Sequence, residues 1–264
     1  MSEVIVVTSG KGGVGKTTVT ANIGCGLAMM GHKVALIDAD TGLRNLDVVL
    51  GLENRIVYDL TDVIAGNCRL RQALIKDKRY EGLHLLPTAQ TKDKSAVQPE
   101  HMISLSEELR DLFDYVILDC PAGIEQGFKS AIAAAEKAIV VTTPEVAAIR
   151  DADRVIGLLE SSGLNDPKVI INRMRTKMVD RGDMMSIEDI LDILGIELLG
   201  VIPDDEQIIV GTNRGEPIVG NDESLSGKAF RNIVMRILGE PVPLLNLEPN
   251  QGFFLKLKKI IGFK

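Results

Sequence analysis

The sequence is poor in residues that mark several common classes of protein. Among its 264 residues there is no tryptophan, aromatic residues make up 3%, and there are three cysteines and three histidines. The cysteines, Cys25, Cys68 and Cys120, show neither a CxxC motif nor the spacing of a metal site, and their odd number argues against a disulfide framework. We therefore expect a protein that keeps its thiols reduced, as in the cytoplasm.

Long apolar runs and an excess of basic residues are also missing. No run approaches the roughly 18 apolar residues that a membrane-spanning helix needs. No basic region precedes the first apolar stretch, EVIVVTSG, so we expect no targeting segment. The net charge of −7 argues against general binding of nucleic acids. The length suits one sizeable α/β domain or two small ones.

Short apolar runs alternate with longer helical patterns along the chain. The runs are almost continuously apolar, which is typical of parallel strands covered on both faces. The expected strands are EVIVVTS (3–9), KVALID (33–38), GLHLLP (82–87), DYVILD (114–119), KAIVVTT (137–143), KVIIN (168–172) and IELLGVIP (196–203). The expected helices span 16–30, 126–136, 146–161, 186–195, 205–212 and 226–238. This alternation predicts an α/β fold, a doubly wound and mainly parallel sheet with helices on both faces.

The segment SGKGGVGKTT, residues 9–18, follows the first expected strand and opens the first expected helix. It contains the phosphate-loop pattern GxxxxGK[ST], in which backbone N–H groups and the helix N-terminus face phosphate oxygens. Lys16 should neutralise the β and γ oxygens, and the Thr17 hydroxyl should bind Mg²⁺. The expected nucleotide-binding residues of the loop are Gly10, Lys11, Gly12, Gly13, Val14, Gly15, Lys16, Thr17 and Thr18.

Acidic residues end two further strands, beside the same expected cleft. DYVILDCPAG ends its strand with Asp119, a Walker B-like acid placed to hold the Mg²⁺ shell. VALIDADTG ends another with Asp38 and Asp40, although Asp38 would also suit a simple turn. Ligands of such sheets bind at the carboxyl ends of the strands, where all three carboxylates fall.

Asn172 and Arg173, after another strand, are the candidates for reading the base. An asparagine amide can pair with both N6 and N7 of adenine. The chain has no NKxD pattern of the kind that reads guanine, so we expect ATP rather than GTP. Pro203 and Asp204, at the end of the last expected strand, complete the predicted nucleotide-binding set.

The second lysine of the loop, Lys11, gives KGGVGKTT a resemblance to the deviant Walker A motif of the ParA/MinD family of P-loop ATPases. DADTGLRNLDVVLGL (38–52) and DCPAGIE (119–125) resemble the two switch regions of that family. PEVAAIRDADR, RGDMMSIEDIL, LLGVIPDD and NRGEPI are similar to further family segments. The resemblance runs from residue 2 to the C-terminus.

The resemblance implies an ATP-dependent homodimer in which each nucleotide lies between two protomers. Lys11 would reach the partner's phosphates as an arginine finger does elsewhere, and Gly12 would line the dimer face. Asp40 would orient the attacking water, and Lys11, Lys16 and Asp40 are thus the expected catalytic residues. Thr17 and Asp38 would serve Mg²⁺, with Asp119 supporting the metal. Composition alone leaves open that Lys11 is a solvated loop lysine.

The C-terminal segment differs from the rest of the chain. Residues 251–264 hold four lysines and no acid. On a helical projection one face carries Phe253, Phe254, Leu257, Ile260 and Ile261, which predicts an amphipathic helix lying on anionic membrane lipids. A helix docked on the body and a basic solvated tail are the alternatives. We expect an ATPase domain over 1–240, a proline-containing linker over 241–250 and this membrane-targeting helix over 251–264.

Together these features predict a Mg²⁺-dependent ATPase that cycles on and off the cytoplasmic face of the cell membrane, and the family resemblance implies that it selects the division site. The resemblance implies a MinC-like division inhibitor and a MinE-like activator as partners, and we expect no specific nucleic acid. The alternatives are the flagellar-number regulator of the same family, a DNA-partition ATPase, an iron–sulfur reductase relative and a non-enzymatic membrane scaffold. The acidic body opposes DNA binding, and no second cysteine has a context suited to a cluster.

Overall fold

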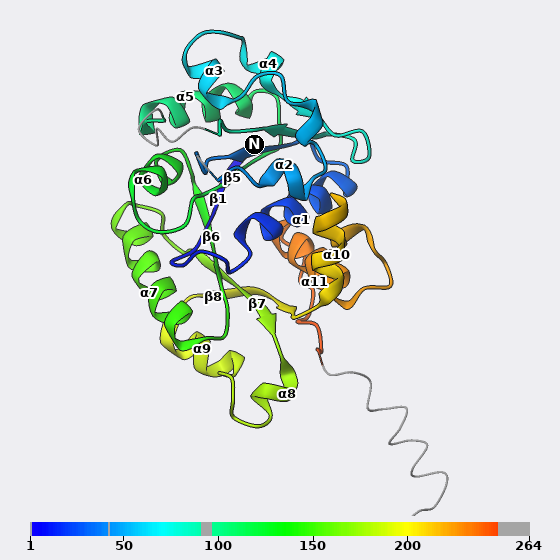
Figure 1. The fold of residues 1–264 in the computed structure, drawn as a ribbon. Coiled ribbons are helices and arrows are strands. Elements are labelled where there is room, and N and C mark those ends of the chain that lie inside the picture. Colours follow the sequence, from blue (N-terminus) through cyan, green and yellow to red (C-terminus); the bar gives the residue numbers. More distant parts are fainter. Residues whose placement is uncertain (1, 42, 91–96, 248–264) are drawn as a thin grey trace, which may run out of the picture.

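The computed structural model describes residues 2–41, 43–90 and 97–247, and a central sheet organises them (Figure 1). The sheet has eight strands in these residues, in the order β3-β4-β2-β5-β1-β6-β7-β8. All neighbouring strands are parallel except β3 and β4. The strands are β1 (Glu3–Thr8), β2 (Val34–Asp38), β3 (Ile75–Lys76), β4 (Leu83–Leu86), β5 (Tyr115–Asp119), β6 (Lys137–Thr142), β7 (Lys168–Met174) and β8 (Glu197–Pro203).

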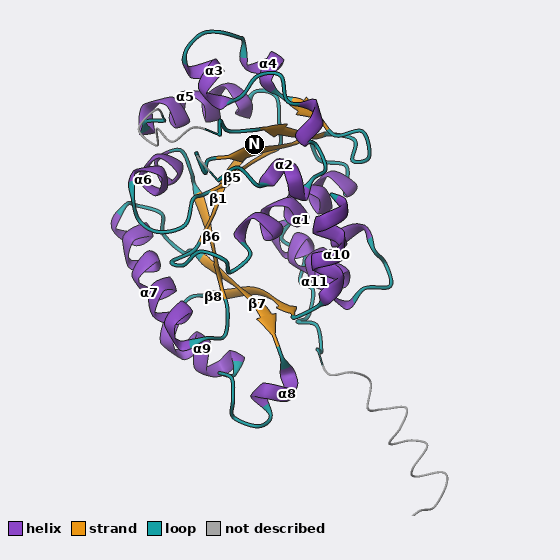
Figure 2. Cartoon of the chain, in the orientation of Figure 1, coloured by secondary structure: helices purple, strands orange, loops and turns teal. Residues whose placement is uncertain are grey.

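Helices cover both faces of the sheet, as the purple and orange elements of Figure 2 show. Each α-helix connects strands or closes the end of the body. They are α1 (Lys16–Met29), α2 (Leu46–Val49), α3 (Leu60–Ile64), α4 (Leu70–Ala73), α5 (Pro99–Arg110), α6 (Gln126–Ala133), α7 (Val146–Ser161), α8 (Thr176–Val179), α9 (Ile187–Leu194), α10 (Glu206–Arg214) and α11 (Leu225–Ile237). Two 3₁₀ turns, η1 (Glu53–Arg55) and η2 (Ile218–Gly220), lie among the described residues.

A separate hydrophobic core fills each side of the sheet. Leu105 of α5, Phe128 of α6 and Ile149 of α7 belong to the core on one face. Ile23 of α1 and Phe230 of α11 belong to the core on the other face. The strands contribute side chains to both cores, which explains why their sequences are apolar at nearly every position.

The predicted fold class is confirmed, and every strand and helix expected between residues 3 and 238 is present. The helix expected over 126–136 ends earlier, at Ala133, because β6 already begins at Lys137. The short strand β3 and the helices α2, α3, α4, α5 and α8 were not expected.

The C-terminal part is only partly described. Residues 241–247 form neither helix nor strand, and the predicted amphipathic helix over 251–264 lies outside the described residues. That helix, its five apolar residues and the division into domain, linker and tail therefore stay predictions. Among the residues that are described, no helix combines the length and apolar character needed to cross a bilayer.

Candidate nucleotide-binding site

The phosphate loop joins β1 to α1 at the centre of the sheet. Gly15 precedes α1 with a φ of 99°, a left-handed conformation that glycine adopts without strain. A Cβ at this position would also collide with the side-chain amide of Asn172. The loop can therefore turn into α1 and lie against β7 only with glycine at position 15, which leaves the first N–H groups of the helix directed at the loop.

The two loop lysines lie in different environments. Lys16 is 8% exposed, at the start of α1, and its charge acts on Asp119. Lys11 is exposed, and its Nζ lies 3.8 Å from Oε2 of Glu145 in a solvent-facing pair of the weak kind. The structure thus places one lysine inside the expected phosphate site and the other on the surface beside it.

Asp38 and Asp119 are direct neighbours across β2 and β5, because the register pairs these two residues at the carboxyl ends of their strands. Asp38 is 1% exposed and Asp119 is 2% exposed. Burial, followed by the charge of Asp119, raises the pKa of Asp38 to about 8. Burial raises the pKa of Asp119 to about 6, although hydrogen bonds from Thr17 and Thr20 and the charge of Lys16 lower it.

This carboxylate pair fits a magnesium ion. A divalent cation would compensate the charge of two buried acids that lie side by side, and carboxylate and hydroxyl oxygens are hard ligands that Mg²⁺ accepts. The hydroxyl of Thr17 hydrogen bonds to Asp119, which brings together all three predicted metal residues. In the described part of the chain, no group of three or more His, Cys, Asp or Glu side chains could hold a metal. Water and phosphate oxygens would have to complete the shell, as is usual for magnesium in nucleotide sites.

Asp38 also fixes the segment that follows β2. Its Oδ1 accepts a hydrogen bond of 3.0 Å from the N–H of Asp40. Its Oδ2 accepts bonds of 3.2 Å from the N–H groups of Asn45 and Leu46, at the start of α2. The predicted water-orienting residue Asp40 is therefore bound through its backbone to a predicted metal ligand.

A groove of about 420 Å³ lies beside the phosphate loop, at the carboxyl ends of β7 and β8. Its lining contains six of the predicted nucleotide-binding residues, namely Gly15, Thr18, Asn172, Arg173, Pro203 and Asp204. The lining is completed by Arg175, Asp205, Ile208, Ile209, Thr212 and Asn213. The base-side prediction thus identified residues that come from distant parts of the sequence and lie together.

The contacts of Asn172 bear on its expected role. Its Nδ2 donates to the carbonyl of Val14 at 2.8 Å, and its Oδ1 accepts from the N–H of Arg173 at 3.0 Å. Asn172 therefore fastens the phosphate loop to β7, and pairing of its amide with adenine stays a prediction. Arg173 has a φ of 59°, a left-handed conformation that is uncommon outside glycine and concentrates at functional sites.

The remaining predicted loop residues lie on the turn between β1 and α1. Val14 is buried, whereas Gly12 and Gly13 are exposed on the outer turn of the loop, and Gly10 begins it. Thr20 is a site residue that the sequence did not reveal: its hydroxyl donates to Oδ1 of Asp119 at 3.1 Å. Arg175 is another, because its Nε lies 2.6 Å from Oδ2 of Asp204 across the groove. Each follows a predicted residue by two or three positions, and only that proximity could have indicated it.

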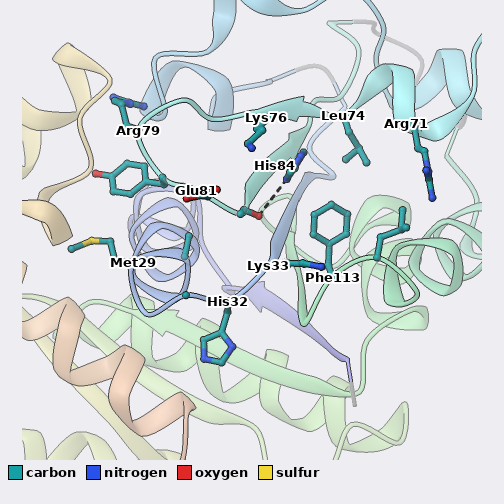
Figure 3. A pocket seen from close by; sticks show the side chains of 15 residues that line it. Met29, His32, Lys33, Arg71, Leu74, Lys76, Arg79, Glu81, His84 and Phe113 are labelled. Carbon is teal, nitrogen blue, oxygen red and sulfur yellow. Dashed lines mark hydrogen bonds between the residues drawn. The ribbon is translucent and has the colours of Figure 1, made fainter.

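A larger hollow, of about 890 Å³, lies elsewhere in the molecule (Figure 3). Its lining includes Lys33, which precedes β2, and His84 of β4. Both lie toward the amino ends of their strands, whereas the phosphate loop and the carboxylates lie at the carboxyl ends of the strands. The predicted phosphate-binding and metal-binding residues therefore favour the smaller groove as the nucleotide site, although the other hollow is larger.

Comparisons with known proteins identify a nucleotide-binding family. A family model described as the CobQ/CobB/MinD/ParA nucleotide binding domain matches residues 5–218. The chain is 54% identical over 267 residues to the septum site-determining protein MinD of Bacillus subtilis, covering 100% of both chains. It superposes on a chain of the MinC:MinD cell division protein complex of Aquifex aeolicus with a TM-score of 0.86 and 52% identity, covering 93% of this chain and 99% of that one. For the MinD of Pyrococcus horikoshii complexed with Mg-ADP the TM-score is 0.82 and the identity 34%, covering 90% and 96%.

Proposed function

The chain belongs to the MinD group of the CobQ/CobB/MinD/ParA family of nucleotide-binding proteins, and on that premise we propose that it is an ATP-driven switch in the selection of the cell division site. The observation that carries the proposal is the buried pair of Asp38 and Asp119 beside the phosphate loop and Lys16. A buried lysine next to two buried acids suits a site for a metal–phosphate complex, in which every charge finds a partner.

Each side chain has a defined task in the proposed hydrolysis of ATP to ADP and phosphate. The loop N–H groups and Lys16 hold the β and γ phosphates, and Thr17, Asp38 and Asp119 hold Mg²⁺. The metal supplies charge neutralisation at the phosphate oxygens. Asp40 orients the attacking water, and Asn172, Arg173, Pro203 and Asp204 form the base side. The Mg-ADP bound to the Pyrococcus relative supports this choice of nucleotide and metal.

Lys11 links hydrolysis to assembly. It is exposed, and its partner Glu145 is exposed as well, so a weak ion pair is all that must break before Lys11 reaches another protomer. In the proposed homodimer Lys11 contacts the phosphates bound by the partner, and ATP stabilises the dimer. Hydrolysis removes the γ phosphate and thereby allows the dimer to dissociate.

The sequence of the tail suggests how the dimer would reach a membrane. One short amphipathic helix with four lysines binds anionic lipid weakly, because ordering the chain opposes burial of the apolar face. Two tails on one dimer bind far better through effective concentration. The ATP form is then peripheral on the cytoplasmic face of the cell membrane, and the ADP form is cytoplasmic.

The proposed partners follow from the relatives. The MinC:MinD complex from Aquifex supports a MinC-like division inhibitor as the protein that the ATP dimer recruits. A MinE-like activator would stimulate hydrolysis and return the chain to the cytoplasm. This second partner rests on the family resemblance alone.

The test combines hydrolysis with sedimentation on vesicles of anionic phospholipid. The unmodified chain should hydrolyse ATP only with Mg²⁺ and should pellet with vesicles more fully under ATP than under ADP. Lys16→Ala should lose both properties. Lys33→Ala removes an exposed lysine that lies just before β2, at the end of the strands opposite to the phosphate loop, and it should keep both properties. Equal pelleting under ATP and ADP, below saturation, would reject the switch, and hydrolysis without Mg²⁺ would reject the metal site.

A further inference from the structure

A buried acid and an arginine outside the predicted site join two helices that border it. Asp77 lies between β3 and β4 and is 1% exposed. It accepts hydrogen bonds from the backbone N–H of Arg79 at 2.6 Å and from Nη2 of Arg79 at 2.9 Å. Burial by itself would raise the pKa of Asp77, but the bonds from Arg79 outweigh burial and lower it. The guanidinium is thus held in place by a charged partner that solvent does not reach.

The other donors of Arg79 cap two helix ends at once. Nη2 donates to the carbonyl of Leu50, the C-cap residue that follows α2. Nη1 donates to the carbonyl of Gly215, the C-cap residue that follows α10, at 2.5 Å. Carbonyls at helix C-termini lack partners within the helix and carry partial negative charge, so one guanidinium satisfies one carbonyl at each of the two ends. In Figure 3 Arg79 lies at one edge of the large hollow, with Arg71 at the opposite edge.

The two capped helices reach opposite sides of the nucleotide site. At the start of α2, the N–H of Leu46 donates to Asp38, a predicted metal ligand. Because α2 is a single turn, about 6 Å long, and both Leu46 and Leu50 are fully buried, a shift at one end moves the other. The other helix, α10, supplies Ile208 and Ile209 to the base-side groove.

The same two helix ends also touch directly. Gly51 and Gly215 both adopt positive φ, of 61° and 66°. A Cβ on Gly215 would lie 2.7 Å from the backbone nitrogen of Gly51, closer than real Cβ atoms come. The two backbones therefore meet without side chains between them, and Arg79 ties the junction from the side.

From these contacts we infer that Arg79 is a positioning residue that couples the metal side of the nucleotide site, through α2, to the base side, through α10. The inference rests on the proposed function. A purely structural arginine would stabilise the fold equally with and without ligand. Replacing a coupling residue, in contrast, must change how much Mg²⁺ strengthens nucleotide binding.

The experiment measures the affinity of fluorescent mant-ADP with Mg²⁺ and with EDTA, and takes the ratio as the coupling factor. Arg79→Gln removes the charge held by Asp77, and Arg79→Lys keeps the charge but loses the fork that spans two carbonyls. Gly215→Ala keeps the arginine and pushes the junction apart. The control is Arg110→Gln, because Arg110 has a similar exposure, is ion-paired with Glu136 at 2.7 Å and lies on α5.

The coupling factor should fall about fivefold or more in Arg79→Gln and Gly215→Ala, less in Arg79→Lys, and not at all in Arg110→Gln. If the three junction variants lower the melting temperature but keep the factor of the unmodified chain, the coupling role is wrong. If Arg79→Gln does not fold, Arg79→Lys and Gly215→Ala decide by the same criterion. An unmodified chain that binds no mant-ADP would overturn the proposed function as well, which distinguishes that failure from the failure of Arg79 alone.

Discussion

Replacing Asp38 with asparagine should change how the stability of the ligand-free protein depends on pH. Asp38 and Asp119 have folded-state pKa values of about 8 and about 6, raised mainly by burial from an ordinary value of 3.8. The folded state therefore holds protons that the unfolded state has already released. The contribution of these two protonated carboxyls to the free energy of unfolding is fully present below the unfolded pKa and is lost as pH rises through the folded pKa. The free energy of unfolding must therefore decrease between about pH 4 and pH 8.

The size of the effect follows from the raised pKa of Asp38. A difference of one bound proton between the folded and unfolded states changes the free energy of unfolding by about 1.4 kcal/mol per pH unit. Between pH 6 and pH 8 the folded Asp38 goes from almost fully protonated to about half protonated, whereas the unfolded one is ionised throughout, and the loss amounts to roughly 2 kcal/mol. Asp119 adds little above pH 6, because its folded pKa is about 6. For a domain of this size the loss corresponds to about 5 °C in melting temperature.

Thermal unfolding followed by circular dichroism, in EDTA at pH 6, 7 and 8, measures this dependence. The unmodified chain should lose about 5 °C over the range, whereas Asp38→Asn should lose much less. His84 titrates in the opposite direction, since burial lowers its pKa, but it does so in both proteins and cancels in the comparison. Mg²⁺ with nucleotide should abolish the difference, because the cation replaces the protons. Equal slopes in the two proteins would show that this carboxylate is not held protonated.

Three further predictions concern the catalytic lysine pair, the expected water-orienting acid and the tail. Lys16→Ala should abolish productive use of ATP, whereas Lys11→Ala should still bind nucleotide but lose the ATP-dependent dimer; light scattering with ATP checks both, and full dimerisation of Lys11→Ala would sink the role in trans. Asp40→Ala should bind ATP and dimerise but hydrolyse on the order of 10²-fold more slowly in single-turnover assays, and near-normal hydrolysis would move the role elsewhere. Deleting residues 251–264 should leave ATP binding intact and abolish pelleting with vesicles, and Leu257→Glu should do nearly the same. Rising salt should weaken binding of the intact chain to vesicles, because salt screens the lysines.

The fold could be predicted because its signals are local and strong. Continuous apolar runs indicated the parallel strands, and Ser186 with acids after it marked the start of α9, where a capping box is present. The missed helix α5 carries a buried stripe at Met102, Leu105 and Leu109 with Pro99 in its first turn, a pattern that was readable. Strand β3 is two residues long and pairs antiparallel with β4, and no periodicity can appear over that length.

The candidate site was predictable where a residue type is tied to a loop or a strand end. The phosphate loop and the location of Asp38 and Asp119 at the carboxyl ends of strands follow from the motif and from where the acids stand, whereas their direct pairing depends on a strand order that was not predicted. The role of Asn172 as a tie to Val14 did not follow, since an amide has several partners available and only the folded geometry selects one. The junction role of Arg79 was equally invisible, because two of its acceptors are the backbone carbonyls of Leu50 and Gly215, which are far away in sequence.

Asp38 connects metal occupancy to the segment that follows it. One of its oxygens accepts from the N–H of Asp40, and the other accepts from the N–H groups of Asn45 and Leu46. A carboxylate that shares its lone pairs with a cation accepts weaker or fewer hydrogen bonds from its backbone partners. Binding of the metal and the geometry of residues 40 and 45–46 therefore cannot be independent. The acid expected to position the attacking water is bonded to the acid expected to hold the metal, so the first can respond to whether the second is occupied.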